Sequence, residues 1–170
     1  MKLSEGIESG LHCALLLAMI PEDAVLPAKA LAEFHGVSET YLLKHLQTLA
    51  GRGILQAIPG PKGGYRLGRR AETITALDVV EAIEGTESAF RCTEIRQRGP
   101  CPGKPSSYHV PCAINQTMLR AEAAWKDSLR AITITDLVLQ IAGKVDPKSA
   151  QCSTQWIGER LRFQGFAKET

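Results

Sequence analysis

Three cysteines, Cys92, Cys101 and Cys112, lie near one another in a segment rich in proline and glycine. Thiolates are soft ligands that suit iron–sulfur clusters, zinc and copper. The Cys-x8-Cys-x10-Cys spacing is wider than the paired Cys-x-x-Cys of structural zinc sites. The segment therefore predicts metal or thiol chemistry, but its spacing does not decide which sulfurs take part.

Two further candidate ligands, Glu8 and His12, lie four residues apart in a predicted first helix. Residues at this spacing share a helix face, with Cβ atoms about 6 Å apart. A carboxylate and an imidazole placed in this way can converge on one metal. Taken singly, Glu8 is more often a surface carboxylate that stabilises the helix dipole, and His12 a surface histidine. His109 is a second-choice nitrogen ligand.

The other two cysteines have simpler interpretations. Cys13 follows the apolar side of the first helix and is expected to be a small core residue. Cys152 has no partner in the pattern and is expected to be a free thiol. No run approaches the ~18 apolar residues of a membrane span, so we expect a cytoplasmic protein, in which cysteines serve as ligands or sensors rather than as a disulfide framework.

The composition narrows the function classes. The chain is 44% hydrophobic and 22% charged, as in ordinary soluble proteins. No glycine-rich phosphate loop, nucleophile elbow or carboxylate pair is evident, so we do not expect an enzyme. Residues 27–70 carry seven Lys and Arg residues against two Glu residues, whereas the rest is mildly acidic. This charge distribution favours a polyanionic partner.

The elements around these residues predict a mainly α-helical fold with a small two-stranded β wing. A helix over 28–35 stops at Gly36, and Ser38 then caps a helix from Glu39 to about Arg52, which together form a helix-turn-helix. Strands over 54–58 and 65–67 flank a turn dense in proline and glycine. A ribbon after a recognition helix is typical of a winged helix.

A recognition helix reads base edges with its N-terminal residues, and a glycine-rich wing tip enters a minor groove or touches the backbone. Tyr41 could equally pack into the core, and the arginines could be merely solvated. The candidate DNA-binding residues are Ser38, Thr40, Tyr41, Lys44, His45, Lys62 and Arg66.

We expect four parts along the chain. A winged helix-turn-helix domain covers 1–85 and a cysteine-containing loop 86–112. A dimerisation helix, about Ala113 to Ala131, and a short final helix cover 113–143, and a tail covers 144–170. Apolar residues recur along one face of the long helix, which predicts a homodimer; the alternative is that the helix folds back on its own domain. Thr135 is expected to cap the final helix. The tail lacks a clear period, although apolar residues such as Trp156 and Phe166 are candidates for packing.

Several of these motifs resemble one family. The motifs are Gly-Val-Ser-Glu-Thr-Tyr-Leu over 36–42, Gly-Pro-Lys-Gly-Gly-Tyr-Arg-Leu over 60–67, Thr-x-x-Asp-Val-Val over 75–80, and the cysteine pair 92 and 112. They resemble winged-helix transcriptional repressors that include IscR, NsrR and RsrR. The resemblance covers roughly residues 1–142. It implies a homodimer on a pseudo-palindromic DNA operator, with dimerisation through the long helix.

The stretch from Phe90 to Pro100 and the first four residues resemble the RsrR branch in particular. That branch implies a redox-active 2Fe–2S cluster held by two cysteines of one subunit and a Glu and a His of the other. The matching residues are Glu8, His12, Cys92 and Cys112, with Cys101 a further candidate. Aerobically prepared protein can lack such a cluster. The alternatives are a cluster-free regulator of the same fold that senses through reactive thiols, or one with a structural zinc.

Overall fold

The computed structural model describes residues 3–163, and its core is organised around helix α1 (Glu5–Ala18). Cys13, Ala14 and Leu17 of α1 are buried where the helix packs against α3, α4 and α6. Cys13 is thus the core residue that its position on the apolar side of α1 predicts. Burial raises the pKa of its thiol to about 12, so this sulfur stays protonated.

The helix-turn-helix consists of α2 (Ala28–His35) and α3 (Glu39–Gly51). Gly36 ends α2 in the left-handed conformation, with φ of 65°, which a glycine adopts without a steric penalty. Leu42, Leu46 and Leu49 of α3 are fully buried. The opposite side of α3 stays exposed and is available to a partner.

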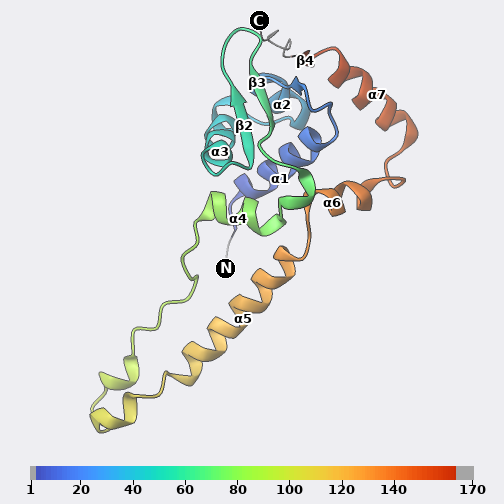
Figure 1. Cartoon of the computed structure of the whole chain (residues 1–170). Coiled ribbons are helices and arrows are strands. Elements are labelled where there is room, and N and C mark those ends of the chain that lie inside the picture. Colours follow the sequence, from blue (N-terminus) through green and yellow to red (C-terminus); the bar gives the residue numbers. More distant parts are fainter. Residues whose placement is uncertain (1–2, 164–170) are drawn as a thin grey trace, which may run out of the picture.

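The wing is the antiparallel hairpin of β2 (Leu55–Ile58) and β3 (Gly64–Leu67). Leu55 pairs with Leu67 and Ile58 with Gly64. The predicted fold class, mainly helical with a two-stranded wing, is confirmed (Figure 1).

A second pair of strands lies beside the wing. The short β1 (Ala24–Val25) pairs with β4 (Arg162–Phe163), while Leu26 exchanges hydrogen bonds with Tyr65 of the wing at 2.8 and 3.0 Å. Before β4, helix α7 (Pro147–Gly158) packs its Trp156 and Ile157 against the core. The sequence pattern predicts neither α7 nor β4. Phe166, another residue proposed to pack, lies outside the described residues.

Two short helices with the same type of cap lie beneath α1. Thr75 and Asp78 form a capping box at the start of α4 (Ala76–Glu84). Thr133 and Asp136 form the same box at α6 (Ile134–Ile141). The prediction that Thr135 caps this helix is therefore wrong, because the Thr-x-x-Asp pair that closes a box begins two residues earlier. A 3-10 turn over Ala71–Thr73 joins the wing to α4.

Helix α5 (Ala113–Arg130) and the cysteine loop form an arm that projects from the domain (Figure 1). Two 3-10 turns, Ile95–Gln97 and Pro105–Tyr108, lie in that loop. At the base of the arm, Nζ of Lys126 lies 3.3 Å from carboxylates of both Glu81 in α4 and Glu122 in α5. No residue of α5 is buried within the single chain, although the helix has an apolar stripe.

Candidate DNA interface and cluster site

The N-terminal part of α3 presents polar side chains on the outside of the domain. Ser38 lies at the N-cap position in an extended conformation, although its side chain makes no capping hydrogen bond. Ser38, Thr40 and Lys44 are exposed, and Tyr41 is 40% exposed. Four of the predicted DNA-binding residues therefore share one accessible surface.

His45 does not belong to that exposed surface. Only 9% of the residue is exposed, and its ring packs against α1 at Gly6 and edge-on against Tyr41, with 4.7 Å between ring centroids. A Cβ on Gly6 would approach the imidazole to 2.4 Å, so the close approach of the two helices requires glycine there. Burial, followed by the charge of Lys44, lowers the pKa of His45 below its ordinary value. The structure thus places His45 in the packing between α1 and α3, where it cannot read bases.

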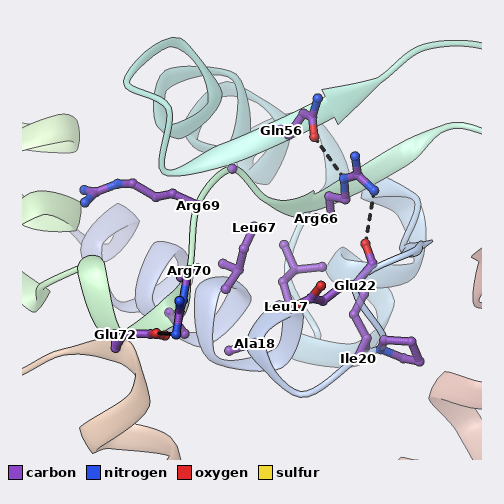
Figure 2. Close-up of a pocket in the computed structure, with 13 residues that line it drawn as sticks. Leu17, Ala18, Ile20, Glu22, Gln56, Arg66, Leu67, Arg69, Arg70 and Glu72 are labelled. Carbon is purple, nitrogen blue, oxygen red and sulfur yellow. Dashed lines mark hydrogen bonds and ion pairs between the residues drawn. The ribbon is translucent and has the colours of Figure 1, made fainter.

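The wing carries the other two residues predicted to bind DNA, Lys62 and Arg66, and they differ in exposure. Lys62 is exposed at the tip. Arg66 is half-buried, with Nε donating to Oε1 of Gln56 at 2.9 Å and Nη1 to the carbonyl of Glu22 at 3.0 Å (Figure 2). Its guanidinium thus ties the wing to the segment after α1.

A hollow of about 670 Å³ lies between the base of the wing and the end of α1, with Leu17 and Leu67 among its apolar residues (Figure 2). Arg70 at its rim pairs with Glu72. Arg69 binds Asp78 of α4 at 2.9 Å. Burial acts to raise the pKa of Asp78, but the backbone hydrogen bond from Thr75 and the Arg69 guanidinium keep this pKa below its ordinary value. These arginines therefore have acidic partners within the domain.

Cys92 and Cys112 lie around a common cation in the arm. The Arg96 guanidinium interacts electrostatically with both sulfurs, and its Nη2 donates to the carbonyl of Val110 at 3.0 Å. Glu94, whose φ of 51° is left-handed, accepts from Nε of Arg96 at 2.6 Å and faces Sγ of Cys92 at 3.7 Å. The backbone thus turns at Glu94 so that one carboxylate contacts both the thiol and the guanidinium.

Cys112 is the N-cap residue of α5. The backbone N–H groups of Asn115 and Ile114 near its sulfur lower the pKa of its thiol, and the charge of Arg96 adds to their effect. A thiolate is the form in which cysteine binds metals. Cys101 is exposed elsewhere in the loop. The donor chemistry of Cys92 and Cys112 therefore fits an iron–sulfur or zinc group, to which the two residues would contribute two sulfurs.

Glu8 and His12 lie on α1, in a pocket of about 440 Å³ that also includes Tyr41 of α3. The pocket contains a histidine that the sequence analysis did not single out, His35, whose ring centroid is 5.5 Å from that of His12. Burial, and then the charge of His12, lower the pKa of His35. Its position at the end of α2 gave no sequence signal, because only the fold brings α2 beside α1.

The four predicted ligands do not meet within one chain. The arm carries the cysteines away from α1 (Figure 1). Among residues 3–163, no group of three or more His, Cys, Asp and Glu side chains is placed to hold one metal ion. A four-ligand site made from these residues therefore needs a second chain.

Within residues 3–163, no helix combines the length and apolar character that a membrane crossing requires.

Comparison with known proteins finds clear similarity over most of the chain. The model of the Rrf2 family, described as iron-dependent transcriptional regulators, matches residues 3–140. YwgB of Bacillus subtilis (strain 168), named as a candidate HTH-type transcriptional regulator, is 31% identical over 164 residues, which cover 96% of this chain and 99% of YwgB. Protein aau3 of Rhizobium meliloti (strain 1021) is 36% identical over 122 residues, or 72% of this chain and 70% of that protein.

Solved structures show the same architecture. CymR (YrzC), the global cysteine regulator of B. subtilis, superposes with a TM-score of 0.63 at 26% identity, covering 82% of this chain and 98% of CymR. The oxidized form of Staphylococcus aureus CymR gives 0.60 at 28% identity, covering 81% and 96%. IscR of T. potens gives 0.62 at 20% identity, covering 88% and 96%, and at this identity the likeness shows the fold alone.

Proposed function

The chain belongs to the Rrf2 family of DNA-binding transcriptional regulators, which are not enzymes, and from this premise we propose a specific mode of action. The proposed protein is a homodimeric regulator, acting as a repressor on a pseudo-palindromic operator. A redox-active 2Fe–2S cluster switches its affinity for that operator. The observation that carries the proposal is the separation, within one chain, of a two-cysteine site on the arm from a Glu–His pair on α1.

The arm supports a dimer. Helix α5 has 18 residues, none of which is buried in the single chain, and Ile114 and Met118 are 64% and 41% exposed. An exposed apolar stripe on a long helix favours burial against a second copy. In such a dimer the arm of one subunit would approach α1 of its partner, where Glu8 and His12 lie. This arrangement corresponds to the ligand set that the RsrR-like motifs imply.

The ligands differ in what they contribute. Cys112 enters with a lowered pKa, so the arm favours the thiolate of this residue, and the Arg96 guanidinium places positive charge near both sulfurs. Histidine ligation raises the reduction potential relative to all-thiolate ligation, as in Rieske centres. When bound, the cluster supplies one-electron redox chemistry. Glu8 and His12 would supply oxygen and nitrogen ligands from an element that packs directly on α3.

The route from sensor to DNA follows from this packing. His12 shares a pocket with Tyr41 of α3, and Gly6 of α1 contacts His45 of α3. A shift of α1 relative to the partner's arm would therefore move α3 and change the spacing of the two recognition helices. Half-site spacing is a geometric requirement for a dimer on a palindromic site. The proposed switch is a change in that spacing.

A second candidate function is a cluster-free regulator that senses through cysteine thiols. The lowered pKa of Cys112 and the exposure of Cys101 favour it, and one of the similar solved structures is that of a global cysteine regulator. Thiolates are also the form that oxidises to a sulfenic acid or a disulfide. In this alternative, Cys112 would react directly and no iron would be present. A structural zinc at the same sulfurs is a third outcome.

Protein isolated without oxygen distinguishes these functions. We expect a visible chromophore with matched iron and sulfide, lost in Cys92→Ala and Cys112→Ala and retained in Cys152→Ala. A colourless protein that contains zinc would instead support the structural zinc site. A metal-free protein whose thiols oxidise reversibly would support the cluster-free thiol sensor. Operator binding is measured on duplexes selected from a random-sequence library, in both redox states.

A mixed dimer tests the shared site. One chain carries Cys92→Ala with Cys112→Ala, and the other carries Glu8→Ala with His12→Ala. If the ligands come from two subunits, each mixed dimer has one complete site and holds half of the wild-type iron. If all ligands came from one subunit, the mixed dimer would hold none, and the shared site would be wrong.

A further inference from the structure

The C-terminal segment, residues 147–163, reaches the wing through Arg162. Nη1 of Arg162 donates to the carbonyl oxygens of Pro61 at 2.9 Å and Gly63 at 3.0 Å. These two carbonyls flank Lys62, the exposed residue of the wing tip. One guanidinium nitrogen therefore spans the turn that presents the predicted DNA contact.

The turn itself is tightly folded. The N–H of Gly63 donates to the carbonyl of Gly60 at 2.8 Å, and a Cβ on Gly63 would lie 2.1 Å from the carbonyl oxygen of Ile58. Charge-assisted hydrogen bonds are stronger than neutral ones. Two such bonds from Arg162 to one turn restrict its conformations, and a turn that is already ordered loses less freedom when it binds DNA.

Arg162 is itself held by its own segment. It pairs with Val25 in the β1–β4 ladder, and β1 leads directly into Leu26, which bonds to Tyr65 of the wing. Upstream, Trp156 of α7 packs against Phe34 of α2 with 5.4 Å between ring centroids, and the Arg160 guanidinium lies 3.8 Å above the Trp156 ring. The segment is thus anchored on α2 and brings Arg162 to a defined place beneath the wing tip.

We propose that Arg162 is a positioning residue for DNA binding, which fixes the wing turn so that Lys62 meets the DNA in a preset conformation. The proposal rests on the proposed DNA-binding function. It assigns a role to residues that lie beyond the 3–140 matched by the family. In this role the C-terminal segment sets operator affinity without touching the operator.

The test compares Arg162→Ala with Lys148→Ala, which removes one positive charge from the same segment at an exposed position of α7. The probe is a fluorescein-labelled duplex that the wild-type full chain selects from a random-sequence library. We expect Arg162→Ala to weaken binding about tenfold, the effect of losing hydrogen bonds to a charged donor, and Lys148→Ala to weaken it less than about twofold. Hydrogen exchange should accelerate over residues 60–65 in Arg162→Ala only.

A double variant identifies the route. If Arg162 acts through the wing tip, adding Arg162→Ala to Lys62→Ala weakens binding little further, since coupled residues are not additive. The proposal would be overturned if the losses of affinity in Arg162→Ala and Lys62→Ala were additive in the double variant. It would also be overturned if Arg162→Ala and Lys148→Ala lost the same affinity, or if hydrogen exchange over residues 60–65 were unchanged in Arg162→Ala. Failure of the wild-type protein to select any duplex would overturn the proposed function instead, while wild-type binding by Arg162→Ala overturns only the role of Arg162.

Discussion

Cys112 shows how position determines the chemistry of a single residue. Its thiol lies at the start of α5, where the N–H groups of Asn115 and Ile114 lower its pKa and Arg96 adds positive charge. Cys13, of the same type, lies in the core with a pKa of about 12. The residue type alone predicts neither value, because each depends on what surrounds the sulfur.

Alkylation of the metal-free protein checks this difference. A lowered pKa means that the Cys112 thiolate persists to lower pH, so its reaction with iodoacetamide should be half-maximal below the ordinary thiol value of 9.0. Arg96→Gln should move that midpoint upward, while Cys13 stays unmodified in the folded protein. Mass spectrometry of each cysteine peptide across pH measures this. A Cys112 profile that matches an unstructured peptide would contradict the assignment.

Gly64 is a second residue whose type is dictated by its neighbours. A Cβ there would lie 2.5 Å from the carbonyl oxygen of Leu26, which is backbone and cannot move aside. We expect Gly64→Ala to lower the free energy of unfolding by about 2 kcal/mol, within the range for overpacking. Gly51→Ala is the control, since the added methyl meets nothing within 4 Å. Chemical denaturation compares the two, and equal stabilities would exclude the clash.

The sequence pattern proposes neighbouring residues of α3 for one role, although their environments in the fold differ. Lys44 and His45 are adjacent, yet Lys44 is exposed and His45 is packed on Gly6 of α1. Arg66, predicted from charge alone, bonds to Gln56 and the carbonyl of Glu22. In each case a contact between segments distant in sequence decides the role, and local spacing carries no record of such contacts.

At the scale of elements, the helix caps give matched comparisons. Thr75 and Thr133 each accept a hydrogen bond from the N–H of the Asp three residues on, whereas Ser38 caps α3 without such a bond. Replacing a capping threonine with alanine should cost about 1 kcal/mol. Thr75→Ala and Thr133→Ala should therefore unfold at lower denaturant than Ser38→Ala. If Ser38→Ala lost as much stability as the two threonine variants, the side-chain hydrogen bond would not be what distinguishes the caps.

Asp78 links the α4 cap to the wing through Arg69, and this makes stability depend on pH. Its pKa is lower in the folded state than in the unfolded chain, so its stabilisation is complete above the ordinary value of 3.8. The stabilisation is lost as pH falls through the lower, folded-state pKa. Asp78→Asn should therefore be less stable than wild type at pH 7, with the difference shrinking at acidic pH. Thermal unfolding across pH measures it, and a pH-independent difference would contradict this linkage.

The predicted elements were most accurate where local signals were strong. Gly36 and the Pro/Gly-rich wing turn mark boundaries that the structure reproduces within a residue or two. Helix α7 was missed because its sequence lacks a sharp apolar period, and its docking depends on Phe34 of α2. Strand β4 has two residues and forms only because β1 offers an edge.

For the whole molecule, the exposed face of α5 has to be covered for the proposed sensor to form. Met118→Glu places a charge on this face without altering the DNA-binding domain. We expect the variant to become monomeric by light scattering, to lose the cluster, and to bind operator at least tenfold more weakly, because it engages one half-site at a time. Thr117→Glu, at another exposed position of α5, is the control. A Met118→Glu dimer with bound iron would show that dimerisation uses another surface.

The Lys126 contact with Glu81 gives the arm the mechanics of a lever. About 14 residues of helix separate Lys126 from Cys112, a length of about 21 Å, so each degree of rotation about Lys126 displaces Cys112 by about 0.4 Å. The short end of this lever is α4, which packs on both α1 and α3. A displacement of Cys112 would therefore produce a smaller displacement at α4, with a larger force.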